Sequence, residues 1–495
     1  MKVTTIRCLA ANYGFLQPDI FTMLSAAVSA GVFPCPTERR NGTLFLFSLL
    51  FYAWGEPVYV VLMLFSTALD YTCGQMVERH RGQRGAKIAL LVSLCVNLGL
   101  LGLFKYSDFL IGTVNSLFGT AISQPNLPLP IGISFYTFQT MSYTIDVYRG
   151  EAKAQKNIIN FGAYVTLFPQ LIAGPIVRYQ TVADELEHRE CTADLFAEGV
   201  KRFACGIGKK VLLANNIGLL WEAASAQAAP TVLTAWLGVI AYGFQIYFDF
   251  SGYSDMAIGL GRMLGFRFLE NFNYPFLADS ITDFWRRWHI SLSTWFRDYL
   301  YIPLGGNRKG TARMYLNLFI VFLVSGIWHG AGWKYIIYGL YYYIIMMLGM
   351  YAEPLIAKFF SALKIKRESA PLNIFRIFRT LILVIGGMML FRADTVCDWI
   401  FMLKRIATDF GGGTFLKDAL LCGMDKADFL ITAIGAAVIF TVSLLQEKGI
   451  EIRGSIAQWA LPARWAVYLA LVLSVIIFGA YGIGYEAVDF IYGQF

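Results

Sequence analysis

Two histidines in apolar surroundings are the residues of this chain best suited to catalysis. His329 ends the apolar run 315–328, and His289 lies in the string FWRRWHISLS at 284–293. The whole chain contains only four His. An ionisable side chain inside an apolar segment indicates a functional site, and imidazole is the usual general base near neutral pH. We expect proton transfer at His329; the alternative is a buried histidine that only bonds across helices.

The residues around His329 are small or aromatic. Trp328 and Trp333 flank it, and Gly326, Gly330 and Gly332 surround it in the sequence. Because glycine has no side chain, we expect open space beside the imidazole. Trp328 is expected to contact the substrate there.

A second group of chemistry-bearing residues is charged. On a helix, Asp283 would reach Arg286 and Arg287, three and four residues on. We expect one amphipathic helix over 283–293, with Trp285, Trp288 and Leu292 on its apolar side. Two guanidinium groups beside a histidine can bind a carboxylate or phosphate. The alternative is an interfacial helix with a bound lipid headgroup.

Two further polar features flank these motifs. Asp249 and Asp255 follow an apolar run, and carboxylates at membrane depth cost roughly 2.5–3.5 kcal/mol each. We expect them to face a cavity or a partner, with Asp249 near substrate; the alternative is that they cap helix ends at the water interface. The basic Gly-rich turn 303–310 could neutralise a phosphate or could be an ordinary cytoplasmic loop.

Composition decides what kind of protein positions these residues. Of 495 residues, 57% are apolar and 15% are charged, whereas soluble domains have about 45–50% and roughly 25%. The mean hydropathy is +0.55. These values exclude a soluble enzyme, a disordered chain and a small disulfide-linked secreted domain. The eight Cys are scattered without C-x-x-C spacing, so we expect neither a metal site nor a disulfide framework.

The apolar runs predict an all-α polytopic membrane protein with about eleven transmembrane helices. A span needs about 20 mostly apolar residues. The expected spans are 43–54 with 57–69, 88–104, 131–147, 158–177, 231–250, 315–328, 333–352, 376–391, 427–445 and 464–482. Shorter runs at 21–33, 107–119, 211–221 and 253–265 predict short, interfacial or re-entrant helices.

Prolines and glycines interrupt one of the apolar runs. The string FPQLIAGP at 168–175 predicts a broken or re-entrant element, because irregular backbone at membrane depth needs protein or water around it. We divide the chain into an atypical N-terminal segment, 1–43, and a membrane domain, 44–495. Basic clusters at 79–87, 201–210 and 364–367 are expected in the cytoplasm. The net charge of +8 reflects this bias, and no compact basic motif indicates nucleic-acid binding.

Five strings in order resemble the membrane-bound O-acyltransferase family, and in particular its bacterial branch that O-acetylates alginate. They are LPIGISFYTFQ at 129–139, FPQLIAGP at 168–175, YFDFSGY at 247–253, FWRRWHISLS at 284–293 and IWHG at 327–330. The likeness runs from about Leu44 to the C-terminus. The first 40 residues depart from it, because members usually begin with a longer apolar helix.

The resemblance implies a fold, an activity and partners. It implies tilted and re-entrant helices around a central cavity or tunnel in the bacterial cell membrane. It implies transfer of an acyl group, most simply acetyl from acetyl-CoA with no tightly bound cofactor, to hydroxyls of an extracytoplasmic polysaccharide through a periplasmic hydrolase-like partner. His329 matches the family's catalytic histidine and His289 its second motif histidine.

Three other functions remain open on sequence grounds. D-alanyl transfer to a teichoic-acid-type polymer keeps the chemistry and changes the donor and acceptor. Broken helices and intramembrane charges are also typical of transporters, although the two halves of this chain show no repeat. A scaffold that only recruits a periplasmic transferase would need no base.

Overall fold

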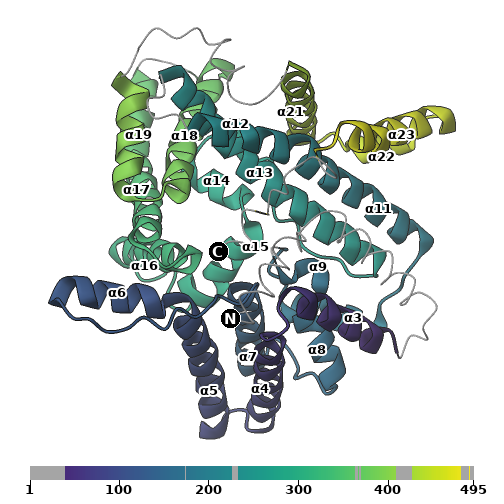
Figure 1. Cartoon of the computed structure of the whole chain (residues 1–495), viewed down its shortest axis with the longest axis vertical. Coiled ribbons are helices and arrows are strands. Elements are labelled where there is room, and N and C mark those ends of the chain that lie inside the picture. Colours follow the sequence, from purple (N-terminus) through teal and green to yellow (C-terminus); the bar gives the residue numbers. More distant parts are fainter. Residues whose placement is uncertain are drawn as a thin grey trace. The chain divides into compact units, whose positions relative to one another are not determined.

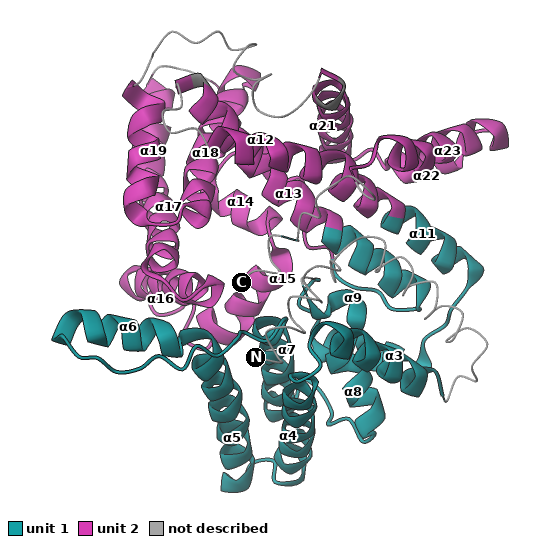
Figure 2. Ribbon diagram, viewed as in Figure 1, with its two compact units in different colours: residues 1–203, 253–269, 489–495 teal, residues 204–252, 270–488 magenta. Residues whose placement is uncertain are grey.

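The computed structural model describes residues 39–172, 174–225, 232–362, 366, 369–408, 426–480 and 490. Within these ranges the regular elements are helices, in agreement with the predicted all-α class. The predicted N-terminal segment 1–43 lies outside the described residues up to position 38. The chain divides into two compact units, one of residues 1–203, 253–269 and 489–495 and one of residues 204–252 and 270–488 (Figure 2).

The first unit holds the N-terminal helices. They are α3 (Arg40–Gly55), α4 (Val60–Arg79), α5 (Arg84–Leu101), α6 (Ser107–Phe118), α7 (Ile133–Arg149), α8 (Ile158–Thr166), α9 (Phe168–Leu171), α10 (Tyr179–His188) and most of α11 (Ala193–Gly208). Within this unit α4 packs against α5 and α7, and α3 packs against α8. A π-helical stretch, Gly102–Tyr106, joins α5 to α6, and α6 then runs in a different direction from α5 (Figure 1).

The predicted break in the run 158–177 is confirmed. Helix α8 ends at Thr166 and the single turn α9 begins at Phe168. The carbonyl of Tyr164 accepts hydrogen bonds from the side-chain amides of Gln139 and Gln170, at 2.9 and 3.0 Å. The freed backbone N–H of Phe168 lies 3.3 Å from Ser48 Oγ. Neighbouring side chains thus bond the backbone groups that the break releases, as a membrane interior requires.

A glycine joins this break to the start of α7. Gly132 has φ +76°, and a Cβ there would lie 2.6 Å from the carbonyl oxygen of Leu171. Any other residue would strain the backbone and collide with α9. The Pro-containing segment before α7 and the broken element therefore pack against each other.

The second unit holds the helices that carry the candidate site. They are α12 (Asn215–Ser225), most of α13 (Val232–Met263), α14 (Ile281–Arg287), α15 (Ile290–Phe296), α16 (Thr311–His329), α17 (Trp333–Ala362), α18 (Ala370–Arg392), α19 (Val396–Thr408), α21 (Lys426–Glu447), α22 (Ile452–Ala457) and α23 (Leu461–Phe478). The run 253–265, expected as a separate short element, instead continues α13 to Met263, because nothing in it interrupts the helical hydrogen bonds.

Seven helices among the described residues are long and apolar enough to cross a membrane. They are Val60–Arg79, Arg84–Phe118, Thr311–His329, Trp333–Ala362, Ala370–Arg392, Phe429–Glu447 and Leu461–Phe478. The last two bury nothing inside the protein over their most apolar windows, as expected of lipid-facing helices. The chain is a multi-pass membrane protein, and the count of eleven spans stays a prediction.

Candidate active site

A close crossing of α16 and α17 positions His329. A Cβ on Gly326 would lie 2.4 Å from the carbonyl oxygen of Tyr335, and one on Gly339 would lie 2.2 Å from that of Phe322. Glycine at both positions lets the two backbones touch, as small residues do between membrane helices. The turn between the helices is only three residues long, so the last residue of α16, His329, is held against α17.

His329 lies in a packed aromatic setting. Its side chain is 4% exposed, and its ring centroid is 5.5 Å from that of Tyr338 and 5.4 Å from that of Phe391. The expectation that glycines leave open space here is wrong. A Cβ on Gly330 would lie 2.1 Å from the ring of Tyr335. The volume that the glycine side chains vacate is filled by α17.

The chain breaks at the second histidine. The predicted continuous helix over 283–293 is wrong, because α14 ends at Arg287 and α15 begins at Ile290. His289 between them has φ +45°, in the left-handed region that L-residues rarely adopt. The expected ion pair from Asp283 to Arg287 does form, with 2.8 Å between Oδ2 and Nε.

An asparagine upstream holds His289 and α15 together. Asn271 Oδ1 lies 3.1 Å from His289 Nδ1, 2.9 Å from Ser291 Oγ and 3.2 Å from the backbone nitrogen of Ser291. The backbone carbonyl of Asn271 also accepts from the N–H of Ile290 at 3.0 Å. Both Asn271 and His289 are buried, at 0% and 1% exposure. Asn271 therefore bonds the first N–H groups of α15, which His289 itself does not cap.

The Trp328 ring lies close to both histidines. Its ring centroid is 5.0 Å from that of His329 and 6.3 Å from that of His289. The His289 ring also packs perpendicular to that of Phe250, with 4.7 Å between the ring centroids. His289 lies outside the seven candidate spans, and burial, with His329 as a second cause, holds the pKa of its imidazole well below the usual range. Burial thus favours the neutral imidazole at His289.

The two arginines of the motif differ in their surroundings. Arg287 is committed to an ion pair with Asp283 and to Glu447 of α21, whose carboxylate oxygens lie 2.7 and 2.9 Å from Nη1 and Nη2. Arg286 is exposed, and its guanidinium forms no hydrogen bond or ion pair with another described side chain. Arg286 is the guanidinium of this pair that a ligand could reach without breaking an existing contact.

The tryptophans of the motif belong to different contacts because of the break. Trp285 packs on the α16–α17 pair, 4.9 Å from Tyr342. Trp288 lies 5.0 Å from Phe272 in a cluster of rings that also includes Tyr247, Phe276 and Phe284. The single apolar side expected for them does not exist.

The carboxylates of α13 are paired inside the protein. Asp249 Oδ1 lies 2.7 Å from Lys210 Nζ, and both side chains are almost fully buried, at 4% and 2% exposure. Asp255 pairs with Arg202 at 2.5 Å within the first unit. Neither carboxylate caps a helix end, because α13 continues through both to Met263. The expectation of a partner is confirmed, and the partners come from a basic cluster that was expected to lie in a cytoplasmic loop.

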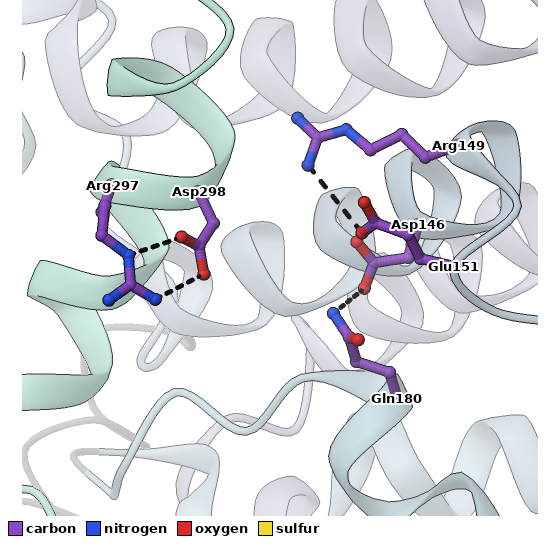
Figure 3. Close-up of polar contacts among 6 residues, drawn as sticks. All are labelled: Asp146, Arg149, Glu151, Gln180, Arg297 and Asp298. Atoms are coloured by element: carbon purple, nitrogen blue, oxygen red, sulfur yellow. Dashed lines mark hydrogen bonds and ion pairs between the residues drawn. The ribbon is translucent and has the colours of Figure 1, made fainter. Parts of the chain in front are cut away.

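Other polar contacts fix turns within each unit. Arg297 bonds Asp298 through Nε and Nη2, at 2.6 and 3.1 Å, ahead of the Gly-rich turn (Figure 3). Asn317 Nδ2 donates to the carbonyl of Gly306 at 2.8 Å, which pins that turn to α16. In the first unit, Gln180 donates to Asp146 at 3.1 Å, at the end of α7 (Figure 3). Arg308 and Lys309 of the turn are exposed.

Sequence reasoning singled out the histidines but did not indicate their neighbours. Asn271 and Lys210 are distant in sequence from His289 and Asp249, by 18 and 39 residues, and reach them only through the fold. For Lys210 a signal existed, since a lysine beside an apolar run must either reach water or find a carboxylate. For Asn271 no spacing in the sequence indicated the contact.

Comparison with known proteins supplies the family. Residues 117–391 match the membrane-bound O-acyltransferase family. The chain is 44% identical to the probable alginate O-acetylase AlgI of Pseudomonas aeruginosa, over 76% of this chain and 72% of that protein. It is 36% identical to the peptidoglycan O-acetyltransferase of Helicobacter pylori, over 60% and 62%. It is 33% identical to the teichoic acid D-alanyltransferase of Bacillus subtilis, over 45% and 59%. The stretch 117–391 that matches the family includes His289, Trp328 and His329. The chain belongs to the membrane-bound O-acyltransferase family.

Proposed function

We propose that this O-acyltransferase moves an acetyl group from a thioester donor to hydroxyl groups of an extracytoplasmic polysaccharide. The observation that carries the proposal is the pair of buried histidines that both lie close to Trp328. Similarity to polysaccharide O-acetylases over most of the chain supports the acetyl group and the polysaccharide.

His329 is the general base of the proposed reaction. It takes the proton of the acceptor hydroxyl while the hydroxyl oxygen forms a bond to the thioester carbonyl carbon. The tetrahedral intermediate then breaks its carbon–sulfur bond, and the imidazolium returns the proton to the thiolate. The C-terminal end of α16 carries partial negative charge, which stabilises the imidazolium formed at His329.

The other site residues bind and orient. His289 orients a substrate or polarises the thioester carbonyl, and the Trp328 ring, close to both imidazoles, contacts the substrate. Arg286 is free to contact an anionic group of the donor, and Arg287 supports the site through its bonds to Asp283 and Glu447. Asp249 stays a predicted substrate contact, although its ion pair with Lys210 gives it a structural role as well.

The donor and the partner follow from the chemistry. Acetyl-CoA is the proposed donor, as a substrate and not a resident cofactor. A periplasmic hydrolase-like protein is the proposed partner that completes delivery to the polymer. A D-alanyl donor is the second candidate; it is supported by a relative that shares a smaller part of this chain.

The first test compares acetyl-CoA turnover by wild type and the His329→Ala variant in nanodiscs, with radiolabelled donor and an oligosaccharide acceptor. Loss of a general base lowers the rate by about 10²–10⁴-fold, so we expect turnover to fall by that factor. His188→Ala is the matched control, because His188 is an exposed histidine paired with Asp184 in α10. It should keep wild-type turnover.

Other outcomes separate the alternatives. Equal turnover in wild type and His329→Ala removes the general-base role. Activity that survives loss of both His289 and His329 when a periplasmic partner is present favours the scaffold. Turnover only with a carrier-bound D-alanyl thioester favours the second candidate, and acceptor uptake without thioester consumption favours a transporter.

A further inference from the structure

The side-chain amide of Asn271 can be oriented without ambiguity. Its oxygen and nitrogen look alike, so the hydrogen-bond network must decide which is which. The atom placed as Oδ1 faces the backbone N–H of Ser291 at 3.2 Å. A backbone N–H is always a donor, and an amide NH₂ in its place would set donor against donor. The atom facing Ser291 and His289 is therefore the oxygen.

The orientation of Asn271 in turn fixes the tautomer of His289. A neutral imidazole carries its proton on one ring nitrogen only. Nδ1 lies 3.1 Å from Asn271 Oδ1, which can only accept. Were Nδ1 unprotonated, two lone pairs would face each other inside a fully buried site. Nδ1 therefore carries the hydrogen and donates it to Asn271, and the lone pair of the ring resides on Nε2.

We propose that Asn271 is a positioning residue that holds His289 as the Nδ1–H tautomer, so that Nε2 acts in the site as a hydrogen-bond acceptor. This proposal rests on the proposed function. It chooses between the two roles given there for His289, which are to orient a substrate and to polarise the thioester carbonyl. A neutral imidazole with its lone pair on Nε2 cannot donate to a thioester carbonyl or to the oxyanion. It accepts a hydrogen bond. The attacking hydroxyl gives its single proton to His329, so the donor to His289 Nε2 is a neighbouring hydroxyl of the acceptor sugar.

Ser291 reinforces the arrangement. Its hydroxyl donates to the same Asn271 oxygen at 2.9 Å, and the hydroxyl oxygen lies 3.5 Å from His289 Nδ1. Three donors converge on one carbonyl oxygen, which prevents rotation of the amide. The same asparagine bonds the start of α15 and so supports the left-handed backbone at His289. Ring orientation, tautomer and backbone are all set by one side chain.

The electrostatic surroundings keep His289 neutral. Among the described residues, His329 on α16 is the titratable group whose charge acts on it, and a positive charge there lowers the pKa of His289 further. Asp249 on α13 is paired with Lys210, and Arg287 on α14 is paired with Asp283 and Glu447. The carboxylates of α13 and α14 are already in ion pairs with Lys or Arg side chains, so they do not stabilise an imidazolium at His289.

A direct test determines the tautomer by nitrogen NMR of ¹⁵N-histidine-labelled protein in nanodiscs. The chain has four His, and the His289→Gln variant identifies the signals of interest. We expect a protonated Nδ1 and an unprotonated Nε2 near neutral pH. A protonated Nε2, or an imidazolium, overturns the proposal. This measurement needs no turnover, so it stands even if the proposed acyl transfer is wrong.

Variants then link the tautomer to activity. Asn271→Leu removes the acceptor, and we expect Nδ1–H and Nε2–H forms to mix and kcat to fall at least tenfold with KM little changed. Asn271→Asp keeps an acceptor and adds a negative charge, which raises the pKa of His289. Since His289 acts unprotonated, the acidic limb of its rate–pH profile should move to higher pH, with activity retained above it.

Two control variants show whether the effects are specific to Asn271. Asn273→Leu is the matched control, because Asn273 is an exposed asparagine two residues further on; it should leave the tautomer and the rate unchanged. Ser291→Ala removes one donor to Asn271 and should keep the Nδ1–H form. An Asn271→Leu protein with wild-type kcat and an unmixed Nδ1–H signal contradicts the proposal. If that variant does not fold, the wild-type spectrum and the Asn271→Asp pH profile decide.

Discussion

At the scale of single residues, the fold holds most side chains of the site in fixed contacts with their neighbours. His329 is enclosed by Tyr338 and Phe391, and His289 is tied to Asn271. Arg287, which the sequence suggested as a ligand for an anion, has its Nε bonded to Asp283 and both Nη atoms bonded to Glu447. The residues left for substrate are therefore few, and Arg286 is prominent among them.

Breaking the Lys210–Asp249 pair tests whether it is structural. Removal of one partner of a buried ion pair costs about 3–5 kcal/mol, so Lys210→Met should lower the unfolding temperature in detergent markedly. Lys210→Met combined with Asp249→Asn leaves no uncompensated charge and should regain much of that stability. Equal stability of the single and double variants would show that the pair contributes little.

The same double variant separates structure from binding at Asp249. A stable double variant that still turns over but has a raised KM identifies Asp249 as a substrate contact, as the sequence predicted. A stable and active one assigns the pair to stability alone.

At the residue scale, the sequence indicates a candidate best where the residue's own chemistry is informative. A histidine at the end of an apolar helix is costly enough to require a reason, and His329 was found on that ground. Asn271 is an uncharged residue in a connecting segment, where asparagine is common for its turn-forming backbone alone. Its contact with His289 depends on how two segments meet, which no pattern within either segment encodes.

At the scale of elements, the α16–α17 pair is the part of the fold on which His329 depends. The sequence placed both helices almost correctly but treated their glycines as space. The backbones fill that space, because packing without side chains brings two helices into direct contact.

Gly326→Ala tests this crossing. The new methyl group would lie 2.4 Å from the carbonyl oxygen of Tyr335, so α17 must move away. We expect a loss of about 1–3 kcal/mol in stability, measured by thermal unfolding in detergent, and a larger proportional loss of acyl transfer because His329 shifts. Gly349→Ala in α17 is the matched control, since its Cβ would meet nothing within 4 Å. Similar unfolding temperatures for the two variants would refute the packing argument.

The short helices show why element boundaries inside motifs are hard to predict. The spacing of Asp283, Arg287 and Trp288 fits a helix, and the ion pair confirms the first turn. The break at His289 arises because Asn271 offers the next N–H groups a better partner than the preceding turn does. By contrast, the break at Leu167 was predictable, because proline and glycine in an apolar run exclude a regular helix.

At the scale of the whole molecule, composition alone identified a multi-pass membrane protein, and the described helices agree. The basic clusters were less reliable as markers of topology. Of the cluster 201–210, Arg202 and Lys210 lie in ion pairs with Asp255 and Asp249. They are poor evidence for a cytoplasmic loop, whereas the cluster around the α4–α5 turn is exposed.

Labelling of the α4–α5 turn tests the orientation. Gln83→Cys, in a background without the native cysteines, places a thiol at an exposed position in this turn. If the turn is cytoplasmic, a membrane-impermeant thiol reagent should label it in lysed cells and not in intact spheroplasts. The cysteine-free parent is the control for background labelling. Labelling in intact spheroplasts would place this turn outside and invert the predicted topology.

The enclosure of His329 also has a consequence for biosynthesis. Trp328 precedes His329 in the chain, but Tyr338 follows it by nine residues and Phe391 by 62. The ribosome delivers α16 before Phe391 is synthesised. The imidazole therefore enters the membrane without the ring of Phe391, and it acquires its final surroundings only after α18 has been inserted. A nascent chain interrupted before that point carries His329, the proposed general base, without the Phe391 ring that encloses it, so we expect competence for acyl transfer to be gained late in translation.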